Sequence, residues 1–295
     1  MMHNPGQILD EVTISDADFV RIAGLVRSMT GIDLQPHKRA MVAARLAKRL
    51  SATGIGSISE YCTRLERGTA DDEVSHFINA YTTNMTRFYR EHHHFEHLAS
   101  DTLPPLIENA RRGGRVRIWS AGCSSGEEAY GIAFSVLDLC PEARQLDIKI
   151  LASDIDLDIL ERAETGHYPK SDADNLPGEQ VQTYFDPLPG TPDQLSVNQQ
   201  ARDLIAFRQL NLHAEWPFGG KFDVIICRNV AIYFDLPTQS SLWRRFGEAL
   251  TETGVLYIGH SEGIDPDNSH LFQIAGRSVF RKNPDNKTTA VKGTS

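Results

Sequence analysis

The chain lacks the features that mark zinc-binding, secreted and membrane proteins. Its four cysteines are scattered and form no CxxC pair, so we expect no zinc knuckle, and a reducing cytoplasm fits. No apolar run is long enough to span a membrane, and the N-terminus lacks the basic start and apolar stretch of a secretory signal. We therefore expect a cytoplasmic protein without membrane insertion. We also expect residues 1–14 to be flexible.

An excess of positive charge is also missing, since the formal net charge is −9 at pH 7. Nucleic-acid-binding proteins usually present a basic surface, so this balance argues against a nucleic-acid partner. One segment differs, because residues 35–59 contain no Asp or Glu and place Lys38, Arg45 and Arg49 in one stripe of a predicted helix. This basic stripe is either a solvated face or a surface for an acidic partner helix or nucleic acid.

Strand patterns are missing from the first third of the chain, which has the periodicity of helices instead. Ser15 or Asp16 caps the first helix, and Gly31 ends it. We predict an all-helical N-terminal domain over residues 15–90 and a linker helix over residues 91–114.

Strands alternate with helices over residues 115–282, which predicts an α/β fold with a doubly wound, mostly parallel sheet. The predicted strands are at 115–120, 148–153, within 204–212, and at 222–227, 255–260 and 278–282, the last at an edge. The helix predicted at 126–139 is amphipathic, with one apolar face. Residues 170–205, rich in Pro, Gly, Asp and Gln, predict a small inserted β-element, and residues 283–295 a disordered tail.

One predicted strand runs directly into a small-residue turn and then a helix, over residues 118–128. Gly122 and Gly126 allow a ligand to approach backbone N–H groups at the helix N-terminus. Ser125 and Glu128 have the spacing of a capping box. The turn predicts a ligand site at the carboxyl edge of the sheet.

Polar residues surround this predicted site. Asp154 ends the next strand, where a carboxylate accepts hydrogen bonds from ribose hydroxyls, and Asp156 is the better cap for the following helix. Asn229 ends a later strand at the same edge. Glu127 and Glu128 would repel a pyrophosphate but not a ligand with a positive centre, such as S-adenosylmethionine. The alternative is that both glutamates only stabilise the helix.

The same turn has the Gly-x-Ser-x-Gly spacing of a hydrolase nucleophile elbow, with Ser124 at its centre. In that alternative, His260 would be oriented by Asp223 or Asp235. The elbow normally follows several strands of its sheet, whereas only helices precede this one, so the sequence favours the cofactor site.

A group of histidines invites a metal site, at His92, His93, His94 and His97. His93 and His97 share a helix face, but an HExxH motif and a third ligand are missing. We predict no metal.

The polar segment at residues 82–91 lies between the helices and the sheet. Its Arg90 could hold a carboxylate bidentately, although the segment could also be a solvated linker helix. Missing near residue 229 is the Asn/Asp-Pro-Pro-aromatic run of methylases that act on amino groups, which argues against methylation of a base or amide nitrogen.

Taken together, these segments resemble the chemotaxis-receptor methyltransferase family (CheR), the S-adenosylmethionine-dependent protein-glutamate O-methyltransferases. The resemblance covers about residues 15–281. It rests on the order and spacing of TTNMTRFYRE (82–91), WSAGCSSGEE (119–128), ASDID (152–156), CRNVAIYF (227–234) and GHSE (259–262). Mild departures are Ala129 for the usual Pro, Tyr89 for Phe and Ser125 for Thr.

The resemblance implies a class I, Rossmann-like methyltransferase domain, an N-terminal helical domain and a small inserted antiparallel β-subdomain. It implies S-adenosylmethionine as cofactor, S-adenosylhomocysteine as product, and glutamates on the cytoplasmic helices of methyl-accepting chemoreceptors as substrate. By motif match, the implied cofactor contacts are Asn84, Thr86, Arg90, Glu127, Asp154, Asn211, Leu212, Asn229 and Val230. Arg90 and Tyr233 are implied near the methyl-transfer centre.

The resemblance also implies that the basic stripe of Lys38, Arg45 and Arg49 faces the acidic receptor stalk. In some family members the β-subdomain grips a peptide at the receptor C-terminus, but the inserted segment here matches only loosely. We expect a monomer. An RNA or small-molecule methyltransferase and a non-catalytic cofactor-binding sensor remain alternative functions.

Overall fold

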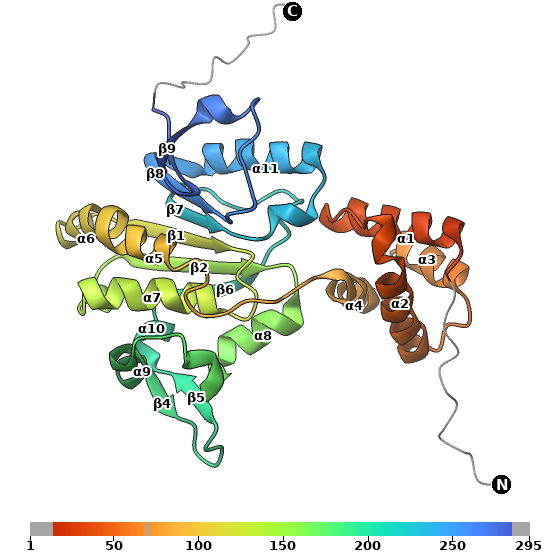
Figure 1. Cartoon of the computed structure of the whole chain (residues 1–295), viewed down its shortest axis with the longest axis horizontal. Coiled ribbons are helices and arrows are strands. Elements are labelled where there is room, and N and C mark those ends of the chain that lie inside the picture. The colour runs from red at the N-terminus through yellow and green to blue at the C-terminus, as the bar shows by residue number, and fades with distance from the viewer. Residues whose placement is uncertain (1–13, 69–70, 285–295) are drawn as a thin grey trace, which may run out of the picture. The chain divides into compact units, whose positions relative to one another are not determined.

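The computed structural model describes residues 14–68 and 71–284. Its contacts divide the chain into two compact units, with the division between Thr83 and Asn84 (Figure 1). The flexible N-terminus and disordered tail that we predicted lie outside the described residues, apart from residues 14, 283 and 284. Ile14 is only 5% exposed and packs in the core of the first unit, because the chain entering the first helix covers that core.

The first unit consists of helices, as predicted. They are α1 (Asp16–Thr30), the 3-10 turn η1 (Pro36–Lys38), α2 (Arg39–Thr53), α3 (Ile58–Glu66) and α4 (Asp71–Tyr81). The Oγ of Ser15 accepts a hydrogen bond from the N–H of Asp18 and so caps α1, and Gly31 ends the helix in the left-handed conformation. Apolar faces of the helices meet in a core around Ile22, Leu46 and Phe77.

The second unit contains a seven-stranded sheet, which confirms the predicted α/β fold. Its strands are β1 (Val116–Ala121), β2 (Ile148–Asp154), β6 (Ile205–Gln209), β7 (Phe222–Cys227), β8 (Leu250–Ile258), β9 (Phe272–Gly276) and β10 (Val279–Lys282). Their order is β6-β2-β1-β7-β8-β10-β9, and the first five are parallel. The predicted edge strand β10 lies inside the sheet, because β9, which we did not predict, pairs with its outer side.

Helices cover the sheet on both faces. They are α5 (His93–His97), the π-helix η2 (Leu98–Thr102), α6 (Leu103–Arg111), α7 (Glu127–Leu139), α8 (Leu157–Thr165) and α11 (Leu236–Ala249), with short 3-10 turns η3 (Ala143–Gln145), η5 (Ala231–Tyr233) and η6 (Ser269–Leu271). The prediction of an amphipathic α7 is wrong, since it is buried all round from Glu127 to Leu137. Its outer side is covered by the inserted segment, where Phe134 stacks on Tyr184 with ring centroids 4.6 Å apart. Among the described residues, no helix combines the length and apolarity needed to cross a membrane.

The inserted segment forms a small antiparallel sheet, as the resemblance implied. It begins three residues earlier than the predicted residue 170, because β3 (His167–Pro169) pairs with β5 (Gln194–Val197). Its other elements are η4 (Lys170–Ala173), α9 (Gly178–Tyr184), β4 (Phe185–Pro187) and α10 (Gln199–Arg202), and the strand order is β3-β5-β4. The Tyr168 hydroxyl donates a 2.6 Å hydrogen bond to the carbonyl of Ser125. The inserted segment therefore supports the turn that follows β1.

Candidate functional site

The predicted cofactor residues of the second unit gather at one edge of the sheet. Strands β6, β2, β1 and β7 are parallel neighbours, so the segments that follow them share the carboxyl edge. The residues that follow these strands are Glu127 after β1, Asp154 at the end of β2, Asn211 and Leu212 after β6, and Asn229, Val230 and Tyr233 after β7. Asn84 joins them, since its carbonyl accepts a 2.8 Å hydrogen bond from Ser124 Oγ.

The turn after β1 is tightly packed. Gly122 and Gly126 have φ of 83° and 94°, and a Cβ on Gly122 would lie 2.4 Å from Val230 Cγ2. Ser124 also has a positive φ, of 50°, and its backbone N–H donates to Asp154 Oδ2 at 2.8 Å. The turn thus needs glycine at Gly122, and Asp154 holds it from the neighbouring strand.

Asp154 and Asp156 have different roles, and Asp156 is the helix cap, as the sequence predicted. Asp156 Oδ1 accepts from the N–H groups of Asp158 and Ile159 and so caps α8. Asp154 is 8% exposed; burial raises the pKa of its carboxyl, while hydrogen bonds from the N–H groups of Asp156 and Ser124 oppose that rise. Each carboxylate oxygen keeps a further lone pair, so Asp154 can hold the turn and accept ligand hydroxyls together.

The predicted capping box is wrong. The N-cap of α7 is Gly126, which has no side chain to make a capping bond, and its backbone is left-handed and not extended as in a capping box. Glu128 instead accepts from Ser120 Oγ and from Arg228 Nε, each at 2.7 Å. Glu127, which is 3% exposed, accepts from Ser125 Oγ, and burial raises the pKa of its carboxyl. Among the described residues, Glu128 forms an ion pair with Arg228, whereas no ion pair is formed by Glu127.

The loop after β7 is held by the carboxylate of Glu262. Its Oε1 accepts from the N–H groups of Val230 at 2.9 Å and Ile232 at 3.3 Å, and its Oε2 from Asn229 at 3.0 Å and Gly259 at 2.6 Å. Burial raises the pKa of Glu262, and these four N–H groups act against the rise. One buried carboxylate therefore sets the backbone of two predicted cofactor residues.

The side chain of Asn229 has a hydrogen-bond acceptor that bears on whether a nucleoside fits here. Its Oδ1 is buried and has no hydrogen-bond partner among the described residues. An unpaired buried acceptor costs about 1–3 kcal/mol, and a ligand donor at this edge would remove that cost. The unpaired acceptor on Asn229, the carboxylate of Asp154 and the close-packed turn at Gly122 fit a nucleoside that carries hydroxyl and amino groups.

The segment at residues 84–91 is not a solvated linker helix. Phe88 is buried and packs edge-on against Tyr168 and Phe185, with ring centroids 5.0 and 5.6 Å away. The Arg90 side chain donates from Nη1 to the carbonyl of Met85 at 3.0 Å. We placed residues 84–90 in the helical domain, but their contacts join them to the unit that contains the sheet.

The hydrolase alternative is not assembled. Ser124 Oγ donates to the Asn84 carbonyl, and His260 Nδ1 pairs with Glu91 Oε1 at 2.7 Å. The two aspartates proposed to orient His260 act elsewhere, since Asp223 accepts from the N–H of Arg117 and Asp235 caps α11.

Two of the four histidines hydrogen-bond within the protein, and His92 lies 3.8 Å from Glu96 at the surface. His94 Nε2 lies 3.2 Å from the carbonyl of Arg277, and His97 Nδ1 lies 2.9 Å from the Tyr257 hydroxyl. Within the described residues, no group of three or more His, Cys, Asp or Glu side chains is arranged to hold a metal ion.

The basic stripe lies in the first unit, and two of its three members bond within that unit. Arg45 donates from Nη1 to the carbonyls of Ala80 and Thr82 at 2.9 and 3.2 Å. Arg49 pairs with Glu73 through both carboxylate oxygens, at 2.9 and 2.5 Å. The interpretation of the stripe as a solvated face is therefore wrong for Arg45 and Arg49, which hold α4 against α2.

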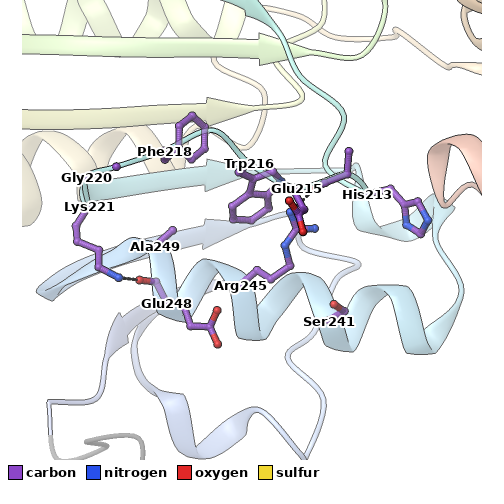
Figure 2. A pocket seen from close by; sticks show the side chains of 12 residues that line it. His213, Glu215, Trp216, Phe218, Gly220, Lys221, Ser241, Arg245, Glu248 and Ala249 are labelled. Carbon is purple, nitrogen blue, oxygen red and sulfur yellow. Dashed lines mark hydrogen bonds between the residues drawn. The ribbon is translucent and has the colours of Figure 1, made fainter.

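A pocket of about 650 Å³ lies between the 213–221 loop and α11, and none of the predicted site residues lines it (Figure 2). Within it, Arg245 lies over the ring of Trp216, 3.9 Å from the centroid, and donates to the Leu212 carbonyl. The guanidinium of Arg245 is thus already bonded to the protein.

Three buried or half-buried charged residues of this edge were not predicted as site residues from the sequence: Arg228, Glu91 and Glu262. Each stands beside an apolar strand or turn in one of the motifs given above. A charged residue in such a position was the sequence signal that could have indicated a role at the site. Their partners lie far away in the chain, 100 residues in the case of Arg228 and Glu128.

Comparison with known proteins shows the family of the chain. The family model "CheR methyltransferase, SAM binding domain" matches residues 84–280, and "CheR methyltransferase, all-alpha domain" matches residues 17–82. The chain is 40% identical over 285 residues to the chemotaxis protein methyltransferase of Escherichia coli (strain K12), covering 95% of both chains. It is 43% identical over 279 residues to that of Klebsiella aerogenes, covering 93% of this chain and 92% of the relative. The chain is a methyltransferase with S-adenosylmethionine as its cofactor, and it belongs to the CheR methyltransferase family.

Proposed function

We propose that this enzyme methylates glutamate side-chain carboxylates on the cytoplasmic helices of chemoreceptors, giving glutamyl methyl esters and S-adenosylhomocysteine. The carrying observation is a likeness to named chemotaxis protein methyltransferases that extends over 95% of the chain, with the motif residues gathered at one sheet edge. Members of one family that agree over this length are expected to share a reaction.

The reaction needs little acid–base chemistry from the protein. A glutamate carboxylate is already ionised near neutral pH, so no general base is required. The bound cofactor supplies an electrophilic methyl group. The protein must then remove water from the carboxylate and align it with that methyl, and such orientation can supply much of the acceleration.

The proposed roles follow the positions of the residues. Asp154 holds the ribose, Asn229 accepts a hydrogen bond from the ligand through its unpaired Oδ1, and Glu127 lies near the charged end of the cofactor. Arg90 and Tyr233 lie near the transfer centre. The remaining residues proposed to line the cofactor are Asn84, Thr86, Asn211, Leu212 and Val230.

Receptor contact is proposed for two surfaces, one in each unit. The basic stripe of Lys38, Arg45 and Arg49 on η1 and α2 faces the acidic receptor helices, although Arg49 already shares its charge with Glu73. In the inserted sheet, β3 and β4 are the outer strands, and either offers a free side for a receptor peptide to pair with.

Radiolabelled S-adenosylmethionine tests the proposal. The enzyme is incubated with receptor cytoplasmic fragments, and the same fragments with their glutamates changed to alanine are the control. We expect label that alkali releases as methanol from the native fragments alone. Alkali-stable label, label on RNA, or cofactor binding without transfer would each contradict the proposal.

A further inference from the structure

Arg90 stands in an unusual turn. The residues on either side of it, Tyr89 and Glu91, both have left-handed backbones, with φ of 51° and 56°. This conformation costs an ordinary L-residue on the order of 1–2 kcal/mol. Two such residues persist around one side chain only when the surrounding structure holds them there.

Arg228 supplies one part of that support. Its side chain is 3% exposed, and its Nη1 donates to the carbonyl of Arg90. Its Nε donates to Glu128, which also accepts from Ser120 on β1. The guanidinium lies over the ring of Phe95, 5.3 Å from its centroid. The Arg90 carbonyl is thereby connected to β1, α7 and β7.

Glu91 supplies the other part. Its side chain is 10% exposed, and Oε1 accepts from His260 Nδ1 at 2.7 Å and from the His260 backbone N–H at 3.4 Å. Oε2 lies 3.9 Å from Arg228 Nη1. Burial alone would raise the pKa of Glu91, but the His260 hydrogen bond and the Arg228 charge bring it below its usual range. Because an ionised carboxylate only accepts, the Nδ1 of His260 must carry the proton.

His260, the partner of Glu91, lies at the carboxyl edge of the sheet. It directly follows Gly259 after β8, and its side chain is 53% exposed, so its Nδ1 is bonded while the ring faces solvent. The nearby His94 does not share this task at neutral pH, because burial, and then the charge of Arg228, lower its pKa to about 4.

We propose that Glu91 and His260 are positioning residues for methyl transfer: the Nδ1–H of His260, accepted by the Glu91 carboxylate, ties the Arg90 turn to the end of β8. The pair keeps the Arg90 side chain directed at the transfer centre without touching cofactor or substrate. This inference rests on the proposed role of Arg90 in the proposed reaction.

Two substitutions separate this role from a role of the exposed ring nitrogen. The amide nitrogen of Asn can replace the His Nδ1, whereas that of Gln replaces Nε2. We expect His260→Asn to keep kcat for receptor methylation within about twofold, and His260→Ala, His260→Gln and Glu91→Gln to lower it about tenfold or more, the worth of a charge-assisted hydrogen bond. Affinity for S-adenosylhomocysteine should fall by a smaller factor than kcat, because Asp154, Asn229 and the turn at Gly122 keep their contacts. His213→Ala, an exposed histidine at the pocket of Figure 2, is the matched control.

Hydrogen exchange gives a readout that does not depend on the reaction. Amides of residues 84–92 should exchange faster in His260→Ala than in the native enzyme, with native exchange restored in His260→Asn. Native kcat in His260→Ala and Glu91→Gln would overturn the inference, as would unchanged exchange, or activity in His260→Gln but not in His260→Asn. A native enzyme that forms no alkali-labile ester would refute the proposed function instead.

Discussion

Glu262 and Val230 are joined by a 2.9 Å hydrogen bond from the Val230 N–H to Oε1, across the ends of β8 and β7. Three more N–H groups donate to the same carboxylate. In Glu262→Gln an amide nitrogen replaces one oxygen and leaves two of the donors without an acceptor. We expect a loss of about 1–3 kcal/mol in the free energy of unfolding, measured with urea. Glu252→Gln, at an exposed position on β8, is the control. Equal urea midpoints for Glu262→Gln and the native protein would contradict the prediction.

Asp154→Ala should weaken binding of S-adenosylhomocysteine by about a hundredfold. The change removes the carboxylate proposed for the ribose and also the acceptor of the Ser124 N–H, so the turn loses its support. Titration calorimetry measures the affinity. Asp158→Ala on the exposed side of α8 is the control, and an affinity within twofold of native would remove the ribose assignment.

Gly122→Ala should destabilise the second unit by about 1–3 kcal/mol and weaken cofactor binding. The added Cβ would meet Val230 Cγ2 at 2.4 Å, at a backbone φ of 83° that disfavours any side chain. Thermal unfolding measures the loss, and Gly263→Ala, which has nothing within 4 Å, is the control. The double change with Val230→Ala should recover part of the stability, because only the clash is relieved. No recovery would mean that backbone strain alone is responsible.

Arg49→Glu should lower the free energy of unfolding of the helical unit by about 2 kcal/mol, because it places a carboxylate against Glu73. A drop in receptor methylation by this variant would therefore say little about receptor contact. The exchanged pair Arg49→Glu with Glu73→Arg restores the attraction and should regain most of the stability, as followed by urea unfolding. If the exchanged pair is stable yet slow on receptor fragments, the charge of Arg49 itself contacts the receptor; native turnover would remove Arg49 from that surface.

The stability of the second unit should fall as the pH is lowered from about 6.5 to 4. His94 has a pKa of about 4 when folded, against 6.5 for an ordinary histidine, so the unfolded chain binds the extra proton in this window. The contribution is present above pH 6.5 and is lost towards pH 4, and its upper limit is about 3.4 kcal/mol. His94→Gln should flatten this part of the curve of unfolding free energy against pH. The same slope in both proteins would show that His94 is not buried in its neutral form.

Much of the fold is determined by local sequence. Helix caps depend on a side chain and the N–H groups two or three residues away, so Ser15 and Asp156 could be identified as caps from the sequence. The parallel sheet follows from apolar runs alternating with helical periods, and the carboxyl-edge residues follow from where those runs end. For this reason the sequence alone predicts the cofactor edge, including Asp154 and Asn229.

Only the tertiary structure decided which charges meet. Glu128 has capping-box spacing from Ser125 but pairs with Arg228, and Arg49 lies in a basic stripe but pairs with Glu73. Burial of α7 on all sides and the place of β9 at the sheet edge also depend on segments distant in the chain. The physical reason is that desolvation and pairing of a charge depend on whichever groups the fold brings within about 4 Å, and spacing along the chain does not encode those groups.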